Sequence, residues 1–213
     1  MSTATELRKT FEEQLAHLTG ESSQRWRWYH GVAFYVMAQV VSFGLASLVS
    51  VSRGENKNPF GDQPYYRSQK QIKIAPPGWL FGPAWTVNNI STIYGNLRAL
   101  NLPENTPGRS TFLGLQAASW VTYGLFSASY FSLRSPINAA VITLSMFGLT
   151  IASVLVSIFQ LKDTKIALSL ATLFLWLMLA SVLATTQALW NRDEFYQAGP
   201  FVEPDPTLVK KWK

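Results

Sequence analysis

Five long apolar segments, separated by short polar connections, make up most of the chain. They cover approximately residues 31–52, 77–101, 110–133, 136–160 and 166–190. Each is long enough to cross the hydrocarbon core of a bilayer, which takes about 20 helical residues. Such segments must be helical in lipid, because a helix satisfies its own backbone hydrogen bonds. The pattern predicts an all-α membrane protein with a five-transmembrane-helix bundle over residues 30–190.

The two ends of the chain lie outside this predicted bundle. Residues 1–29 form a polar N-terminal arm of mixed charge, in which apolar residues recur at helical spacing. This spacing predicts an amphipathic helix that lies on the membrane or a partner, or packs on its own protein. Residues 191–213 form a proline-bearing tail, which we expect to be extended. The apolar positions of the arm are Leu7, Phe11, Leu15 and Leu18.

The second apolar segment opens with an unusual run of prolines and aromatic residues. Proline is tolerated in the first turn of a helix, where its missing N–H would have no partner. The run therefore predicts a helix entry followed by a membrane-crossing helix that ends near Asn101. Its characteristic residues are Pro76, Pro77, Trp79, Phe81, Pro83 and Trp85.

A polar stripe follows on the same predicted helix. Trp85, Asn89, Thr92 and Asn96 are separated by four, three and four residues, which places them on one helix face. In a lipid-embedded helix this face should contact protein or a cavity rather than lipid tails. The stripe predicts a pocket of aromatic and amide side chains inside the bundle. The alternative is that these residues only hold helices together.

The composition is typical of a membrane protein and disfavours several classes of function. Only 14% of the 213 residues are charged, against about 25% in a typical soluble domain, and the charges gather at the ends and connections. Neither metal ligands nor catalytic residues are indicated, which favours a non-enzymatic role, and nucleic-acid binding is not expected. Ionisable residues are absent from the middle of the predicted spans, which argues against a proton-coupled transporter. Basic residues divide eight against ten between the two sides, so orientation stays open.

The run from Pro76 to Thr86, PPGWLFGPAWT, resembles the signature of the TspO/MBR family of tryptophan-rich sensory or translocator proteins. The resemblance covers about residues 31–190. It implies a five-helix membrane fold with a pocket for porphyrins and other flat apolar molecules. It also implies that Tyr66 caps this pocket, that Trp85, Trp176 and Ala180 line it, and that Trp79 and Phe81 are more structural.

Two departures from the family pattern concern the pocket. Asn89, a candidate ligand-binding residue from the polar stripe, stands where the family usually has tyrosine or phenylalanine. Thr172 and Leu173 stand where the family has proline and tyrosine before the last tryptophan. These differences leave the identity of the ligand open.

Two functions follow as expectations. In the first, the protein is a membrane-embedded sensor or receptor that stacks a tetrapyrrole (porphyrin or haem-type), or a sterol-like ligand, between Trp85 and Trp176. In the second, it is a non-catalytic structural or accessory subunit of a larger membrane complex. The partners expected are the lipid bilayer and either a second copy of the chain or such a complex.

Overall fold

A computed structural model of the protein describes residues 25–54 and 63–211. These residues are helical or irregular, and paired extended backbone among them is limited to two isolated bridges. The amphipathic helix predicted for the N-terminal arm lies outside the described residues. In chain order the elements are α2 (Trp28–Ser52), α3 (Gln63–Ser68), the 3-10 turn η1 (Gly78–Leu80), α4 (Phe81–Leu100), α5 (Arg109–Ser127), the π-helical turn η2 (Ala128–Ser132), α6 (Pro136–Phe159), α7 (Thr164–Ser169) and α8 (Ala171–Trp190).

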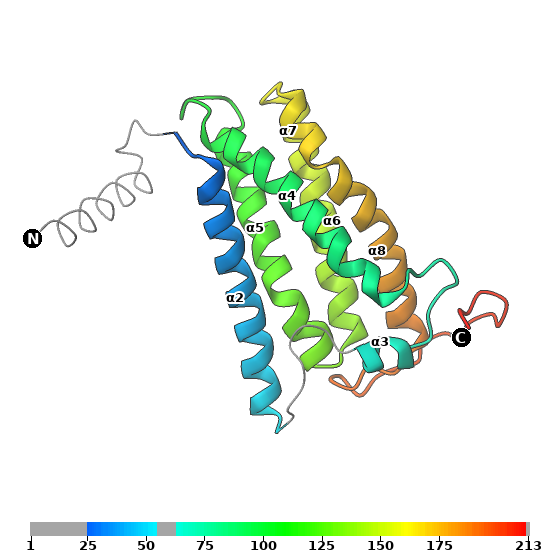
Figure 1. Ribbon diagram of the computed structural model, residues 1–213. Helices are drawn as coiled ribbons and strands as arrows, with labels where there is room; N and C mark the ends of the chain where they lie inside the picture. The colour runs from blue at the N-terminus through cyan, green and yellow to red at the C-terminus, as the bar shows by residue number, and fades with distance from the viewer. Residues whose placement is uncertain (1–24, 55–62, 212–213) are drawn as a thin grey trace, which may run out of the picture.

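The long helices α2, α4, α5, α6 and α8 lie side by side and alternate in direction (Figure 1). Helix α6 packs between α5 and α8, while α2 packs on α5 and η2. Helix α4 crosses the bundle obliquely, from α8 near its start toward α2 and α7 near its end (Figure 1). Because α4 leans away from α2 at its start, these two helices converge at one end of the bundle and diverge at the other.

The long helices are apolar outside and often polar inside. Val40 and Leu48 of α2 are 66% and 69% exposed, whereas Ser42 and Ser50 of the same helix are buried. Three buried hydroxyls of α6 donate to carbonyls one turn earlier in the same helix, namely those of Thr150, Ser153 and Ser157. An apolar outer surface is favourable in lipid and unfavourable in water. The fold is therefore suited to a bilayer.

Three described helices are long and apolar enough to cross a membrane, namely α2, α6 and α8. This confirms the prediction of an integral, multi-pass, all-α membrane protein. The segments predicted over 77–101 and 110–133 contain α4 and α5 with η2, which are more polar. Asn88, Asn89 and Gln116 contribute to that polarity, and all three side chains are buried in the bundle. The number of five crossings accordingly stays a prediction.

The segment predicted as one helix over 166–190 is interrupted at Leu170. The Ser169 hydroxyl donates to the Ile166 carbonyl at 2.7 Å, and the Ser169 carbonyl accepts a bond of 2.7 Å from the hydroxyl of Ser91 on α4. These two bonds engage carbonyls at the end of α7, and α8 starts afresh at Ala171. Asp163 begins α7 by accepting hydrogen bonds from the backbone N–H groups of Lys165 and Ile166.

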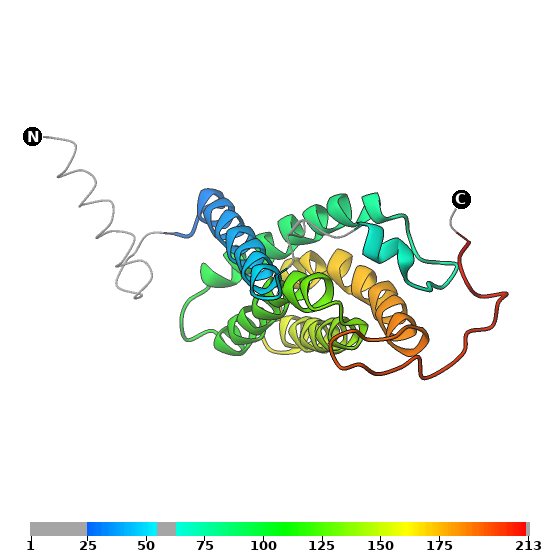
Figure 2. The same ribbon diagram turned by 90° about the horizontal axis from the view of Figure 1, so that it is seen from below.

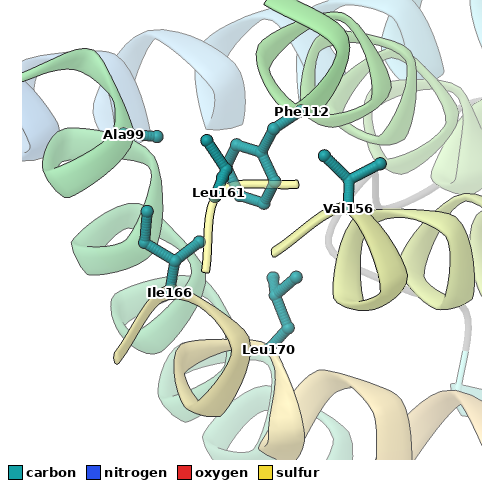
Figure 3. Close-up of a cluster of buried hydrophobic side chains, with 6 residues drawn as sticks. All are labelled: Ala99, Phe112, Val156, Leu161, Ile166 and Leu170. Atoms are coloured by element: carbon teal, nitrogen blue, oxygen red, sulfur yellow. The ribbon is translucent and has the colours of Figure 1, made fainter. Parts of the chain in front are cut away.

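A buried apolar cluster joins the helices at the α7 end of the bundle. Figure 3 shows its side chains directed toward one another from α4, α5, α6 and the α7 region. Gly95 brings α4 onto α7 beside this cluster, since a Cβ atom at Gly95 would lie 2.0 Å from the Ser169 hydroxyl oxygen. The cluster holds one end of the bundle closed. Its members are Ala99, Phe112, Val156, Leu161, Ile166 and Leu170.

The tail after α8 is not simply extended, because it folds back on the loop before α4. The Lys73 N–H donates to the Leu208 carbonyl at 2.8 Å, and the Lys210 N–H donates to the Gln71 carbonyl at 2.7 Å. Asn191 bonds both the N–H (2.7 Å) and the carbonyl (3.0 Å) of Lys70. Seen from below, the tail runs around the end of the bundle toward this loop (Figure 2). The tail therefore holds the loop that carries α3 and η1.

Candidate functional site

A cavity of about 510 Å³ lies inside the bundle, at the end where α2 and α4 diverge. Helices α2, α4, α5, α6 and α8 contribute its walls, and α3, η1 and η2 contribute further lining residues at this end. Its lining is rich in aromatic side chains, and every lining residue is uncharged. These residues are Tyr35, Gln39, Ser42, Phe43, Tyr66, Gly78, Trp79, Phe81, Gly82, Trp85, Thr86, Thr122, Tyr123, Phe126, Ser127, Tyr130, Phe131, Ile142, Thr143, Met146, Trp176, Leu177 and Ala180.

The proline-rich run positions the α4 side of this cavity. Pro77 is extended (φ −64°, ψ 145°) and leads into the 3-10 turn, after which α4 begins at Phe81. Pro83 is the third residue of α4, so its missing N–H costs no intrahelical bond. Phe81 and Trp85 are four residues apart, which places both side chains on the cavity face.

Trp85 and Trp176 form one continuous wall of the cavity. Their ring centroids lie 6.4 Å apart with the planes at 75°, an edge-to-face contact. Phe81 extends the wall on the Trp176 side at 5.3 Å, and Tyr123 extends it on the Trp85 side at 5.2 Å. That a flat ligand stacks between Trp85 and Trp176 stays a prediction; in the structure the two rings contact each other edge to face.

Tyr66, on α3, lies beside the start of this wall. Its ring contacts Phe81 edge to face at 5.3 Å, and its hydroxyl donates to the Pro76 carbonyl at 3.3 Å. Burial raises the pKa of the Tyr66 hydroxyl to about 12, against a lowering by the side chain of Gln71. The phenol is therefore neutral at physiological pH and remains a hydrogen-bond donor. It links α3 to the helix entry at Pro76.

Of the other predicted site residues, some line the cavity and others lie behind its lining. Ala180, one turn after Trp176, lines the cavity and leaves space in front of the indole. Asn89 is buried outside the lining and donates to the Tyr123 hydroxyl at 3.0 Å. Trp79 lines the cavity while remaining 71% exposed. Pro76, Pro77 and Pro83 do not line it; they shape the backbone around it.

Helix α2, and Phe131 of the π-helical turn, supply lining residues that the sequence analysis missed. Tyr35, Gln39 and Ser42 are separated by four and three residues on α2, a spacing that could have identified a cavity face. In η2, the consecutive residues Tyr130 and Phe131 both line the cavity. A π-helical turn inserts an extra residue into a helix. No local pattern of residues signals this turn.

The mouth of the cavity lies beside the start of α4. Three lining residues are exposed at the surface, namely Trp79, Gly82 and Thr86. They are separated by three and four residues and so follow one line along η1 and α4. The other lining residues are half-buried or buried. The cavity therefore opens on the side of the bundle, at the start of α4.

Apolar-surfaced helices around an uncharged aromatic cavity define the class: a multi-pass helical membrane protein with an internal pocket. The model of the TspO/MBR family matches residues 34–190. The chain belongs to the TspO/MBR family, which confirms the resemblance seen in the run from Pro76 to Thr86. A comparison with curated proteins finds no match.

Proposed function

We propose that the protein binds a flat, apolar molecule of the tetrapyrrole or sterol type in this cavity and serves as a membrane sensor of it. The observation that carries the proposal is the cavity itself, with Trp85 and Trp176 on one wall. Its volume of about 510 Å³ falls within the range of roughly 300–1,000 Å³ common for small-molecule sites. Aromatic faces favour flat ligands, because stacked rings gain energy beyond burial alone.

The wall geometry favours a particular binding mode. A flat ligand would lie across Phe81, Trp176 and Trp85 rather than between two indoles, with Tyr66 at one edge. Ala180 would contact the ligand face directly. Helices α2 and η2, through Phe43 and Phe131, would cover the opposite face. Each of these contacts is uncharged, which suits a ligand taken from lipid.

Tryptophan substitutions test the proposal directly. Titrating a porphyrin into the protein in lipid nanodiscs should quench tryptophan fluorescence with a saturable dependence. Trp85→Phe or Trp176→Phe should raise the Kd about three- to tenfold, the loss expected for a good aromatic contact. Trp190→Phe is a matched control on α8, since Trp190 is buried away from the cavity. Equal affinities for all four proteins would count against binding in this cavity.

We also propose that α4 and α5 cross the bilayer, which gives five crossings in all. Their 20 and 19 residues span about 30 Å at 1.5 Å per residue. Some of their buried polar groups pair within the bundle: the side-chain N–H of Gln116 donates to the Ser153 hydroxyl at 2.8 Å. An odd number of crossings puts the two chain ends on opposite sides of the membrane.

Protease or epitope accessibility on sealed vesicles should therefore expose only one terminus of each molecule. An epitope in residues 1–24 and one after Lys211 are the natural sites, because both lie outside the helices described. Exposure of both epitopes on the same side would rule out five crossings.

A further inference from the structure

Four polar side chains from three helices form a hydrogen-bonded chain along one edge of the cavity. Asn89 of α4 donates to the Tyr123 hydroxyl of α5 at 3.0 Å. That hydroxyl donates to Gln39 Oε1 of α2 at 2.8 Å. Gln39 Nε2 in turn donates to the Tyr35 hydroxyl oxygen at 3.2 Å. Tyr35, Gln39 and Tyr123 line the cavity, and Asn89 supports them from behind.

The hydrogen bonds of this side-chain network all run in one direction, from Asn89 to Tyr35, and the network ends in unused donors. The Asn89 amide nitrogen can only donate, so the Tyr123 hydroxyl must pass its own hydrogen on to Gln39. Gln39 then uses one N–H on Tyr35 and keeps a second N–H. The Tyr35 hydroxyl receives that bond and keeps its own hydrogen, for which the described residues provide no acceptor. The polar edge of the cavity thus presents hydrogen-bond donors, which are complementary to an acceptor oxygen on a ligand.

The surrounding lining disfavours a charged acceptor. All of the lining residues are uncharged, so a buried carboxylate would lose its water without meeting a cation. Such desolvation disfavours binding in a low-dielectric site. A ketone, ester or hydroxyl oxygen can accept from Tyr35 and Gln39 without that cost. The free donors and the uncharged lining together favour neutral ligands over acidic ones.

We infer that the cavity selects uncharged flat ligands that carry a carbonyl or ester oxygen, and that Tyr35 and Gln39 recognise this oxygen. The inference rests on the proposed function, because it concerns the ligand class of the same site. It makes a free dicarboxylate porphyrin a poorer ligand than its diester. Tyr35 and Gln39 become specificity-determining residues on α2.

The test compares protoporphyrin IX with its dimethyl ester in nanodiscs, each corrected for uptake by empty nanodiscs. The diester should bind wild-type protein about tenfold more tightly than the diacid, the effect of burying unpaired charge. Tyr35→Phe, which removes one hydroxyl, should weaken diester binding about three- to tenfold. Tyr94→Phe is the matched control, since Tyr94 is 52% exposed on the outer face of α4.

The outcomes separate the inference from the function on which it rests. Diacid binding as tight as or tighter than diester binding overturns the inference and leaves a ligand-binding cavity in place. Unchanged diester affinity in Tyr35→Phe also overturns it, provided that Trp176→Phe weakens binding. Failure of both porphyrins to bind wild-type protein overturns the proposed function and the inference together.

Discussion

Replacing Ala180 by tryptophan is expected to abolish ligand binding while the bundle stays folded. Ala180 lines the cavity one turn after Trp176, so a new indole would occupy the space that faces the aromatic wall. Forcing the ligand past this indole combines overpacking, about 1–3 kcal/mol, with lost stacking, about 0.5–1.5 kcal/mol. The Kd should rise by about a hundredfold or more, measured by porphyrin titration in nanodiscs.

Val182→Trp provides the control for this experiment. It adds the same side chain to the same helix, but Val182 is 43% exposed and lies outside the cavity lining. Its porphyrin affinity should match that of the wild type. Both variants should retain the melting temperature of the wild type within a few degrees. An Ala180→Trp protein that is folded and binds normally would place the ligand elsewhere.

The second large effect concerns stability, and it arises from Asp193 in the loop after α8. This carboxylate is 1% exposed and accepts four hydrogen bonds. One oxygen accepts from the Ser135 hydroxyl (2.6 Å) and the Ile137 N–H (3.0 Å). The other accepts from the N–H groups of Phe195 (3.0 Å) and Tyr196 (2.9 Å). Asp193 therefore joins the start of α6 to the end of α8.

Asp193→Ala should leave these donors without their acceptor in a buried site. A single orphaned donor costs about 1–3 kcal/mol, so the loss should reach about 3 kcal/mol. For a protein of this size, that lowers the melting temperature by roughly 6–12 °C. Asp205→Ala is the matched control, since Asp205 is exposed and accepts from Thr207. Equal melting temperatures for the two variants would show that the four bonds contribute nothing net.

How much the sequence could predict depends on whether the signal was local. Trp85 and Trp176 could be predicted as cavity-lining residues because the sequence resembles the TspO/MBR family at both positions, and Trp85 lies in a long, uncommon motif. The polar stripe correctly placed Asn89 inside the bundle, since amides are costly against lipid. It could not show that Asn89 supports Tyr123 rather than lining the cavity, because one helix face does not reveal its neighbour.

Other features depended on tertiary contacts and left no local pattern. The π-helical turn lies where the Ser132 hydroxyl donates to the carbonyl of Ala46 on α2, at 2.8 Å. The break at Leu170 accompanies bonds that include Ser91 of α4. The tail was expected to be extended because its prolines disfavour helix, and its pairing partners lie far away in the chain, 121 residues in the case of Asn191 and Lys70. Long-range contacts of this kind are decided by the fold as a whole.

The position of the cavity mouth determines whether ligand occupancy depends on the concentration of ligand in the membrane or in water. Because Trp79, Gly82 and Thr86 open the cavity sideways, while the tail holds the loop at the end of the bundle, the opening faces lipid if α4 crosses the bilayer. An apolar molecule would then dissolve in the membrane first and diffuse within its plane to the protein. Occupancy would follow the ratio of ligand to lipid rather than the aqueous concentration. Adding empty vesicles would then release ligand from the protein even if the sample volume stayed constant.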